Sequence, residues 1–155
     1  MKIYIILTFL VALTSSAEWK LKTMKEWRQI SEACTQRYPV SPEVLEKAKI
    51  DKYPPKEMFQ AILCTLREID IWSDTEGLSI DRLMIVLEKA AVEENISKKF
   101  LRDSLESCVD KNSEGTTSLD WVYRCFNCFK GNEKLFKVIE EARFYEESEP
   151  LNYEW

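Results

Sequence analysis

Residues 108–128, CVDKNSEGTTSLDWVYRCFNC, predict the end of one helix, a turn and a second helix. The polar run DKNSEGTT holds one of only three glycines in the chain, so it cannot continue an amphipathic helix. Ser118 is a suitable N-cap for the second helix. Apolar residues then recur at three- and four-residue steps: Leu119, Val122, Phe126 and Phe129. Helices joined by so short a turn lie antiparallel or crossed, which would let Cys108 approach Cys128.

The same stretch resembles part of a known family. The residues CVDKN, a glycine turn and then DWVYR are similar to the region between the fourth and sixth cysteines of insect odorant-binding proteins, which typically carry six. The first, third, fourth and sixth of these match four residues here: Cys34, Cys64, Cys108 and Cys128. The second would fall at Gln60 and the fifth at Leu119. Because those two bond to each other in the family, their joint absence resembles its minus-C branch.

The resemblance implies two disulfide bonds, Cys34–Cys64 and Cys108–Cys128. The residues alone leave the pairing open, since five cysteines can form two bonds in fifteen ways (five choices of the unpaired residue, three pairings of the rest). Cys125 and Cys128 form a C-x-x-C, but a redox motif needs a helix N-terminus at its first cysteine, and this pair lies inside a predicted helix. We expect Cys125 to be a free core thiol, with a reactive thiol or intermolecular pairing as alternatives.

The beginning of the chain has the pattern of a secretory signal peptide. Met1-Lys2 precedes an apolar run from Ile3 to Leu13, and small residues follow up to Ala17. The alternative is a buried N-terminal helix or strand. We therefore expect a secreted, extracellular protein that meets an oxidising compartment. The expected division is a signal peptide at 1–17, a helical domain at 18–145 and an acidic, aromatic tail at 146–155.

Composition and charge exclude several functions. The formal net charge is −5 and no run of Lys or Arg exceeds two, which argues against nucleic acid as a partner. No second long apolar run follows the first, which argues against stable membrane insertion. The chain contains no histidine, the usual general base and the commonest zinc ligand. We therefore expect neither an enzyme nor a cofactor, although paired carboxylates on the polar helix faces are an open alternative.

One segment resembles the first half of a calcium-binding loop. Asp110, Asn112 and Glu114 stand at its first, third and fifth positions and Gly115 at the sixth. The twelfth position, which needs a bidentate glutamate, is Trp121. We therefore expect a turn and no metal at this segment.

The scarcity of glycine and the helical period of the apolar residues predict an all-α, single compact domain of six to seven helices. The expected helices run over 24–38, 42–50, 59–66, 79–91, 98–109, 118–129 and 132–142. Residues 72–77 are expected to form a loop. Asn95-Ile96-Ser97 is a possible glycosylation sequon at Asn95, whereas Ser97 can equally cap a helix, which is the interpretation we favour.

The apolar stripes of the predicted helices either fill a solid core or surround a cavity, and periodicity alone favours the core. The resemblance implies an internal apolar cavity, which the inward stripes would line: Phe59, Leu63, Leu66, Met84, Leu87, Leu105, Val122 and Phe126. The expected function is a secreted carrier for a small hydrophobic molecule such as an odorant, a pheromone or a lipid-like ligand. A salivary scavenger of amines or lipid mediators, or a ligand-free structural or signalling factor, are the alternatives. A chemoreceptor and a homodimer are further candidate partners.

Overall fold

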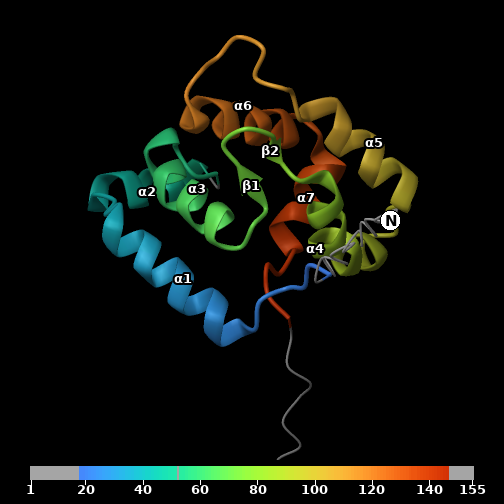
Figure 1. The fold of residues 1–155 in the computed structure, drawn as a ribbon, viewed down its shortest axis with the longest axis horizontal. Helices are drawn as coiled ribbons and strands as arrows, with labels where there is room; N and C mark the ends of the chain where they lie inside the picture. Colours follow the sequence, from blue (N-terminus) through green and yellow to red (C-terminus); the bar gives the residue numbers. More distant parts are fainter. Residues whose placement is uncertain (1–17, 52, 147–155) are drawn as a thin grey trace, which may run out of the picture.

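Seven α-helices dominate the computed structural model, which describes residues 18–51 and 53–146 (Figure 1). The helices, including one 3-10 turn, are α1 (Met24–Arg37), α2 (Pro42–Asp51), η1 (Lys56–Met58), α3 (Phe59–Glu68), α4 (Ile80–Glu93), α5 (Lys98–Cys108), α6 (Ser118–Gly131) and α7 (Glu133–Glu141). The all-α prediction is confirmed. The predicted signal peptide at 1–17 and all of the tail except Glu146 lie outside the described residues.

The segment predicted to be a loop is a small β-hairpin. Strands β1 (Trp72–Ser73) and β2 (Gly77–Leu78) pair antiparallel, with Trp72 opposite Leu78. Asp74 in the turn accepts hydrogen bonds from the Arg67 side chain at 2.6 and 3.1 Å and from the Trp72 indole at 2.9 Å. The Arg67 guanidinium is the main reason that the pKa of Asp74 falls to about 2. Strands of two residues are too short to show an alternating pattern, so periodicity could not predict them.

Polar caps fix where most helices begin. Thr23 forms a capping box with Glu26 at the start of α1, and Ser79, Ser97 and Asn132 cap α4, α5 and α7. The expected cap of α6 is wrong by one residue. Thr117 has the extended backbone of a cap and accepts from the Asp120 N–H, so Ser118 is already the first helical residue.

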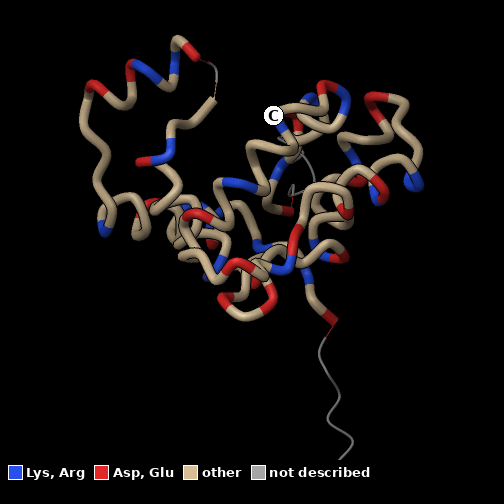
Figure 2. The backbone as a smooth tube through the Cα atoms, turned by 90° about the horizontal axis from the view of Figure 1, so that it is seen from above, with Lys and Arg blue, Asp and Glu red and all other residues tan. Residues whose placement is uncertain are grey.

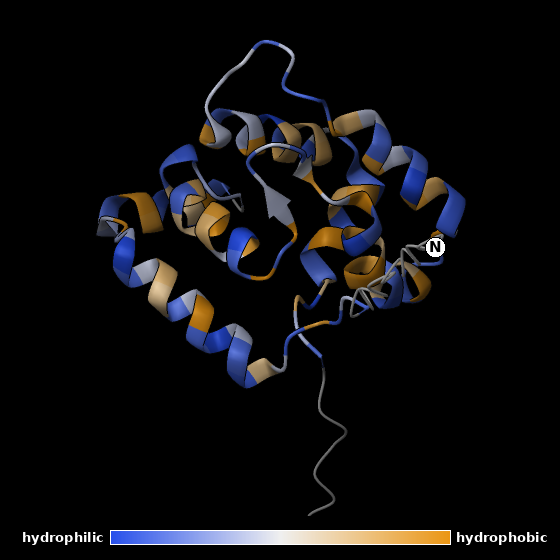
Figure 3. Ribbon diagram, in the orientation of Figure 1, coloured by the Kyte–Doolittle hydropathy of each residue, from blue (hydrophilic) through white to orange (hydrophobic). Residues whose placement is uncertain are grey.

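The hydrophobic core lies where α3, α4, α5, α6 and α7 meet the hairpin. Its fully buried side chains include Phe59, Leu105 and Val122, and Trp72 meets Trp121 edge-on with ring centroids 4.9 Å apart. Figure 3 shows hydrophobic and hydrophilic residues alternating along the helical ribbons, as amphipathic helices require. Lys and Arg are interspersed with Asp and Glu over the described chain (Figure 2). Within the described ranges, every helix is too short or too polar to cross a membrane.

Both implied disulfides are confirmed. Cys34–Cys64 joins α1 to α3, and Cys108–Cys128 joins α5 to α6. Cys125 is buried and forms no disulfide, and burial raises the pKa of its thiol. Helix α1 lies at one edge of the domain and packs mainly against α3 (Figure 1). Cys34 is its only buried residue, and Trp27 and Ile30 are the partly buried residues by which this helix packs against the core.

Candidate functional site

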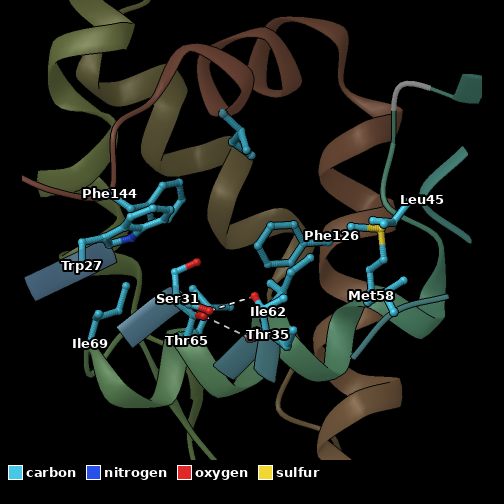
Figure 4. Close-up of a pocket in the computed structure, with 14 residues that line it drawn as sticks. Trp27, Ser31, Thr35, Leu45, Met58, Ile62, Thr65, Ile69, Phe126 and Phe144 are labelled. Carbon is cyan, nitrogen blue, oxygen red and sulfur yellow. Dashed lines mark hydrogen bonds between the residues drawn. The ribbon is translucent and has the colours of Figure 1, made fainter. Parts of the chain in front are cut away.

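A pocket of about 390 Å³ lies between α1 and α3 and reaches α6 and α7 (Figure 4). Its walls come from segments that are far apart in the sequence. They are lined by Trp27, Ser31, Thr35, Val40, Leu45, Met58, Ala61, Ile62, Thr65, Leu66, Ile69, Phe126, Ile139 and Phe144. Aliphatic and aromatic side chains and a methionine predominate, so the pocket is suited to an apolar molecule.

The helical period sets the side of the pocket that α1 forms. Trp27, Ser31 and Thr35 follow one another at four-residue steps, which places them on one face of the helix. The facing side of α3 contributes Ala61 and Thr65, also four residues apart. Because the Cys34–Cys64 bond holds these two helices together, it also fixes the width of the pocket between them.

The segment after α7 closes one side of the pocket. Phe144 lies beside Trp27 in Figure 4, and the ring of Tyr145 is 5.7 Å from that of Trp27. The Glu146 N–H donates to the Lys22 carbonyl at 2.7 Å, which ties this segment to the chain just before α1. The segment after α7, which closes this side of the pocket, is therefore held in place by the residues just before α1.

Few polar groups face the pocket. The Thr35 hydroxyl donates to the Ser31 carbonyl at 2.8 Å, and the Thr65 hydroxyl donates to the Ala61 carbonyl at 3.1 Å. Among the described residues, no charged side chain lines the pocket. The polar side-chain groups that line the pocket are therefore neutral: three hydroxyls and the Trp27 indole.

The predicted cavity residues fall in three places. Leu66 and Phe126 line the pocket, and Met84 lies at a separate hollow of about 60 Å³ beside α4 and α5. The remaining five are buried in the core and do not line the pocket: Phe59, Leu63, Leu87, Leu105 and Val122. The inward stripes of α3 to α7 pack largely against one another, which leaves the larger hollow on the α1 side of α3.

Sequence reasoning missed most of the pocket wall. The α1 residues Trp27 and Ser31 share a face with few apolar neighbours, and Phe144 lies outside any periodic segment. One signal could have pointed to the site. Helix α1 carries the large aromatic residue Trp27, but its apolar stripe is too narrow to bury that side chain in a core. Ile62 lines the pocket while the next residue of α3, Leu63, is buried in the core, and the helical period alone does not separate these two neighbours.

The segment that resembles a calcium loop is a turn closed by an arginine. Arg124 donates to both carboxylate oxygens of Asp110, at 2.7 Å and 3.0 Å, and holds the pKa of that carboxyl below its usual value. The Gly115 N–H donates to the Asn112 carbonyl at 2.9 Å, and Gly115 has a φ of +66°. Asp110, which stands at the first position of the calcium-loop pattern, is thus paired with the positive charge of Arg124.

The helical fold, the two disulfides and the apolar pocket describe a small disulfide-linked binding domain, and comparison with known proteins gives its family. The PBP/GOBP family profile matches residues 16–132, so the chain belongs to that family. It is 27% identical over 140 residues to Odorant-binding protein 22 of Aedes aegypti, covering 89% of this chain and 96% of that protein. It is 24% identical over 129 residues to General odorant-binding protein 99a of Drosophila melanogaster, covering 83% and 88%.

Proposed function

We propose that this protein is a secreted carrier that encloses a small, largely apolar molecule, such as an odorant or pheromone, in the pocket between α1 and α3. The observation that carries the proposal is the uncharged pocket of about 390 Å³ in a chain of this family. Its volume falls in the range of about 300–1,000 Å³ that is typical of small-molecule sites. Beyond the ligand, the proposed partners are a chemoreceptor or a second copy of the chain.

The proposed mechanism is burial without reaction. Removing about 250 Å² of apolar ligand surface from water gains about 6 kcal/mol at about 25 cal/mol per Å². The ligand and the side chains around it lose freedom on binding, which offsets part of this gain. A gain of about 6 kcal/mol corresponds to a dissociation constant of roughly 40 μM, and the offset weakens binding toward the high micromolar range.

The pocket chemistry disfavours the alternatives. A scavenger of amines needs a carboxylate to pair with the ammonium group, and no Asp or Glu of the described residues lines the pocket. A ligand-free structural factor would need no internal pocket, whereas this domain has a pocket of about 390 Å³ between α1 and α3. A neutral ligand is the occupant that fits.

Filling the pocket tests the proposal. Ala61 lines the pocket from α3, and the neighbouring Gln60 on the same helix is exposed. We expect Ala61→Phe to lower the affinity for the fluorophore N-phenyl-1-naphthylamine at least about tenfold, because the new ring occupies the space of the ligand. Gln60→Phe is the matched control and should bind as the wild type does. Equal affinities for the two variants in a fluorescence titration would place the ligand elsewhere.

We also propose that residues 1–17 are removed on secretion, so that the mature chain begins at Glu18. Asn95 is exposed and follows α4 with a φ of +56°. Ser97 caps α5, which is the interpretation favoured above, and glycosylation of Asn95 is the alternative. The mass of the secreted protein, before and after removal of N-linked glycans, tests both proposals. A mass that includes residues 1–17 would exclude the first.

The proposed four-cysteine subtype rests on Gln60 and Leu119, which stand where the missing bonded pair would be. Gln60 is exposed on α3, Leu119 is half-buried on α6, and these two helices pack against each other. The Lys56–Asp120 ion pair joins η1 to α6 in the same region. These positions support the proposal that a bond between α3 and α6 was replaced by packing and surface charge.

Restoring the bridge is the test of this subtype. We expect the double variant Gln60→Cys with Leu119→Cys to form a disulfide, to gain about 2 kcal/mol in free energy of unfolding and to admit ligand more slowly. Thiol titration of the unfolded, unreduced protein should then find one free thiol, that of Cys125. Three free thiols would show that the two positions do not correspond to the missing pair.

A further inference from the structure

The indole N–H of Trp27 is buried and has no hydrogen-bond acceptor among the described residues. The other described tryptophans are all paired: Trp19 donates to the Ile69 carbonyl at 3.1 Å, Trp72 to Asp74 at 2.9 Å and Trp121 to the Asp110 carbonyl at 3.2 Å. A buried donor without an acceptor is destabilising and uncommon in folded proteins. An acceptor supplied by a ligand would remove that cost.

Trp27 lies on the wall of the pocket, and its polar neighbours lie on the same side. Ser31, one turn further along α1, has a hydroxyl that makes no hydrogen bond within the described part of the chain. The hydroxyls of Thr35 and Thr65 donate to their own helices, so their oxygens keep lone pairs free to accept. Figure 4 shows these three hydroxyl residues close together on the wall that α1 and α3 form. The pocket therefore has one polar wall in an otherwise apolar surface.

The polar wall is neutral. Among the described residues, the pocket has no Lys, Arg, Asp or Glu, so a charged ligand group would lose its hydration without gaining a countercharge. The unpaired group at Trp27 is a donor and needs an acceptor. A neutral oxygen on an apolar body meets both conditions.

We infer that the pocket selects neutral ligands with an oxygen acceptor, such as ketones, esters or alcohols, and that Trp27 Nε1 donates a hydrogen bond to that oxygen. The inference rests on the proposed carrier function and adds the ligand class and the residue that recognises it. Ser31 can donate a second hydrogen bond to the same oxygen, and the oxygens of Thr35 and Thr65 can accept from an alcohol. Hydrocarbons leave the indole unpaired, and ammonium or carboxylate groups lose their hydration without a countercharge.

Four ligands of equal chain length test this selection: 2-nonanone, nonane, nonylamine and nonanoate. The affinity of each ligand is measured by its displacement of N-phenyl-1-naphthylamine from the mature protein at neutral pH. We expect 2-nonanone to bind about tenfold more tightly than nonane, as one satisfied buried donor implies. Nonylamine and nonanoate should bind more weakly than 2-nonanone. Equal affinity for 2-nonanone and nonane would overturn the inference and leave the carrier function intact, whereas a probe that never binds would overturn the carrier function itself.

A substitution at Trp27 assigns the effect to its N–H. Trp27→Phe keeps an aromatic ring and removes the donor, so the preference for 2-nonanone over nonane should fall to about twofold or less. Nonane is the internal control for any loss of shape. In the wild type, the NMR signal of the Trp27 indole proton should move downfield with 2-nonanone and not with nonane. An indole signal that responds equally to both ligands would contradict a hydrogen bond at this atom.

Discussion

Ligand binding is expected to depend on the Cys34–Cys64 disulfide far more than on Cys108–Cys128, although the two bonds contribute similarly to stability. They close loops with sequence separations of 30 and 20 residues, for which the chain-entropy model gives about 3–4 kcal/mol each. Only the first bond holds α1, which contributes Trp27, Ser31 and Thr35 to the pocket, whereas the second bond ends on α6, which contributes Phe126 alone. Loss of that bond should free the helix that carries Trp27.

The double variants Cys34→Ser with Cys64→Ser, and Cys108→Ser with Cys128→Ser, separate binding from stability. We expect the first to lose affinity for N-phenyl-1-naphthylamine at least about tenfold, and the second to stay within about threefold of the wild type, because only the first loosens the wall that α1 forms. Both titrations are made at a temperature at which circular dichroism shows a folded protein. Equal losses of affinity would mean that α1 is held in place by packing and that the bond is dispensable for the pocket.

A methyl group at Gly77 is expected to cause the largest loss of stability among single substitutions in the hairpin. Gly77 has a φ of +79°, and a Cβ built on it would lie 2.5 Å from Cζ2 of Trp121. The Trp121 ring cannot easily move, since it is buried, meets Trp72 edge-on and donates to the Asp110 carbonyl. Gly77→Ala combines a left-handed backbone with overpacking, so we expect a loss of about 3 kcal/mol or more in the free energy of unfolding.

Gly115→Ala is the matched control for the clash. Gly115 also has a positive φ, +66°, but no atom lies within 4 Å of the position a Cβ would take. The Gly115→Ala variant should therefore lose only the backbone contribution, about 1 kcal/mol of the free energy of unfolding. Urea denaturation of the two variants measures the difference directly. Equal losses would show that the close approach between the hairpin and Trp121 does not constrain the fold.

The helices could be predicted because their signals are local. Ser79 and Asn132 mark starts that short polar side chains define, and Pro42 opens α2 at the position where a proline fits. The start of α6 was placed one residue late, because Thr117 and Ser118 are adjacent and equally able to cap. Which of them does so depends on where the preceding turn ends, and that is set by tertiary contacts.

The pocket was harder to predict than the core, because periodicity shows which face of a helix is buried and not what covers it. Phe59 and Phe126 belong to inward faces of α3 and α6 and meet edge-on with centroids 5.4 Å apart, yet only Phe126 lines the pocket. Trp27 lies within the first predicted helix, 24–38, but was not predicted to line a site. Its role depends on the distance between α1 and α3, which no local pattern encodes.

A bound ligand can be located by contacts between its protons and assigned methyl groups of the protein. With N-phenyl-1-naphthylamine bound, we expect intermolecular nuclear Overhauser effects to the methyl groups of Met58, Ile62 and Ile139, which line the pocket. We expect none to Leu87 and Leu105, which are fully buried in the core. Effects to Leu87 and Leu105 without effects to Ile62 would contradict a binding site between α1 and α3.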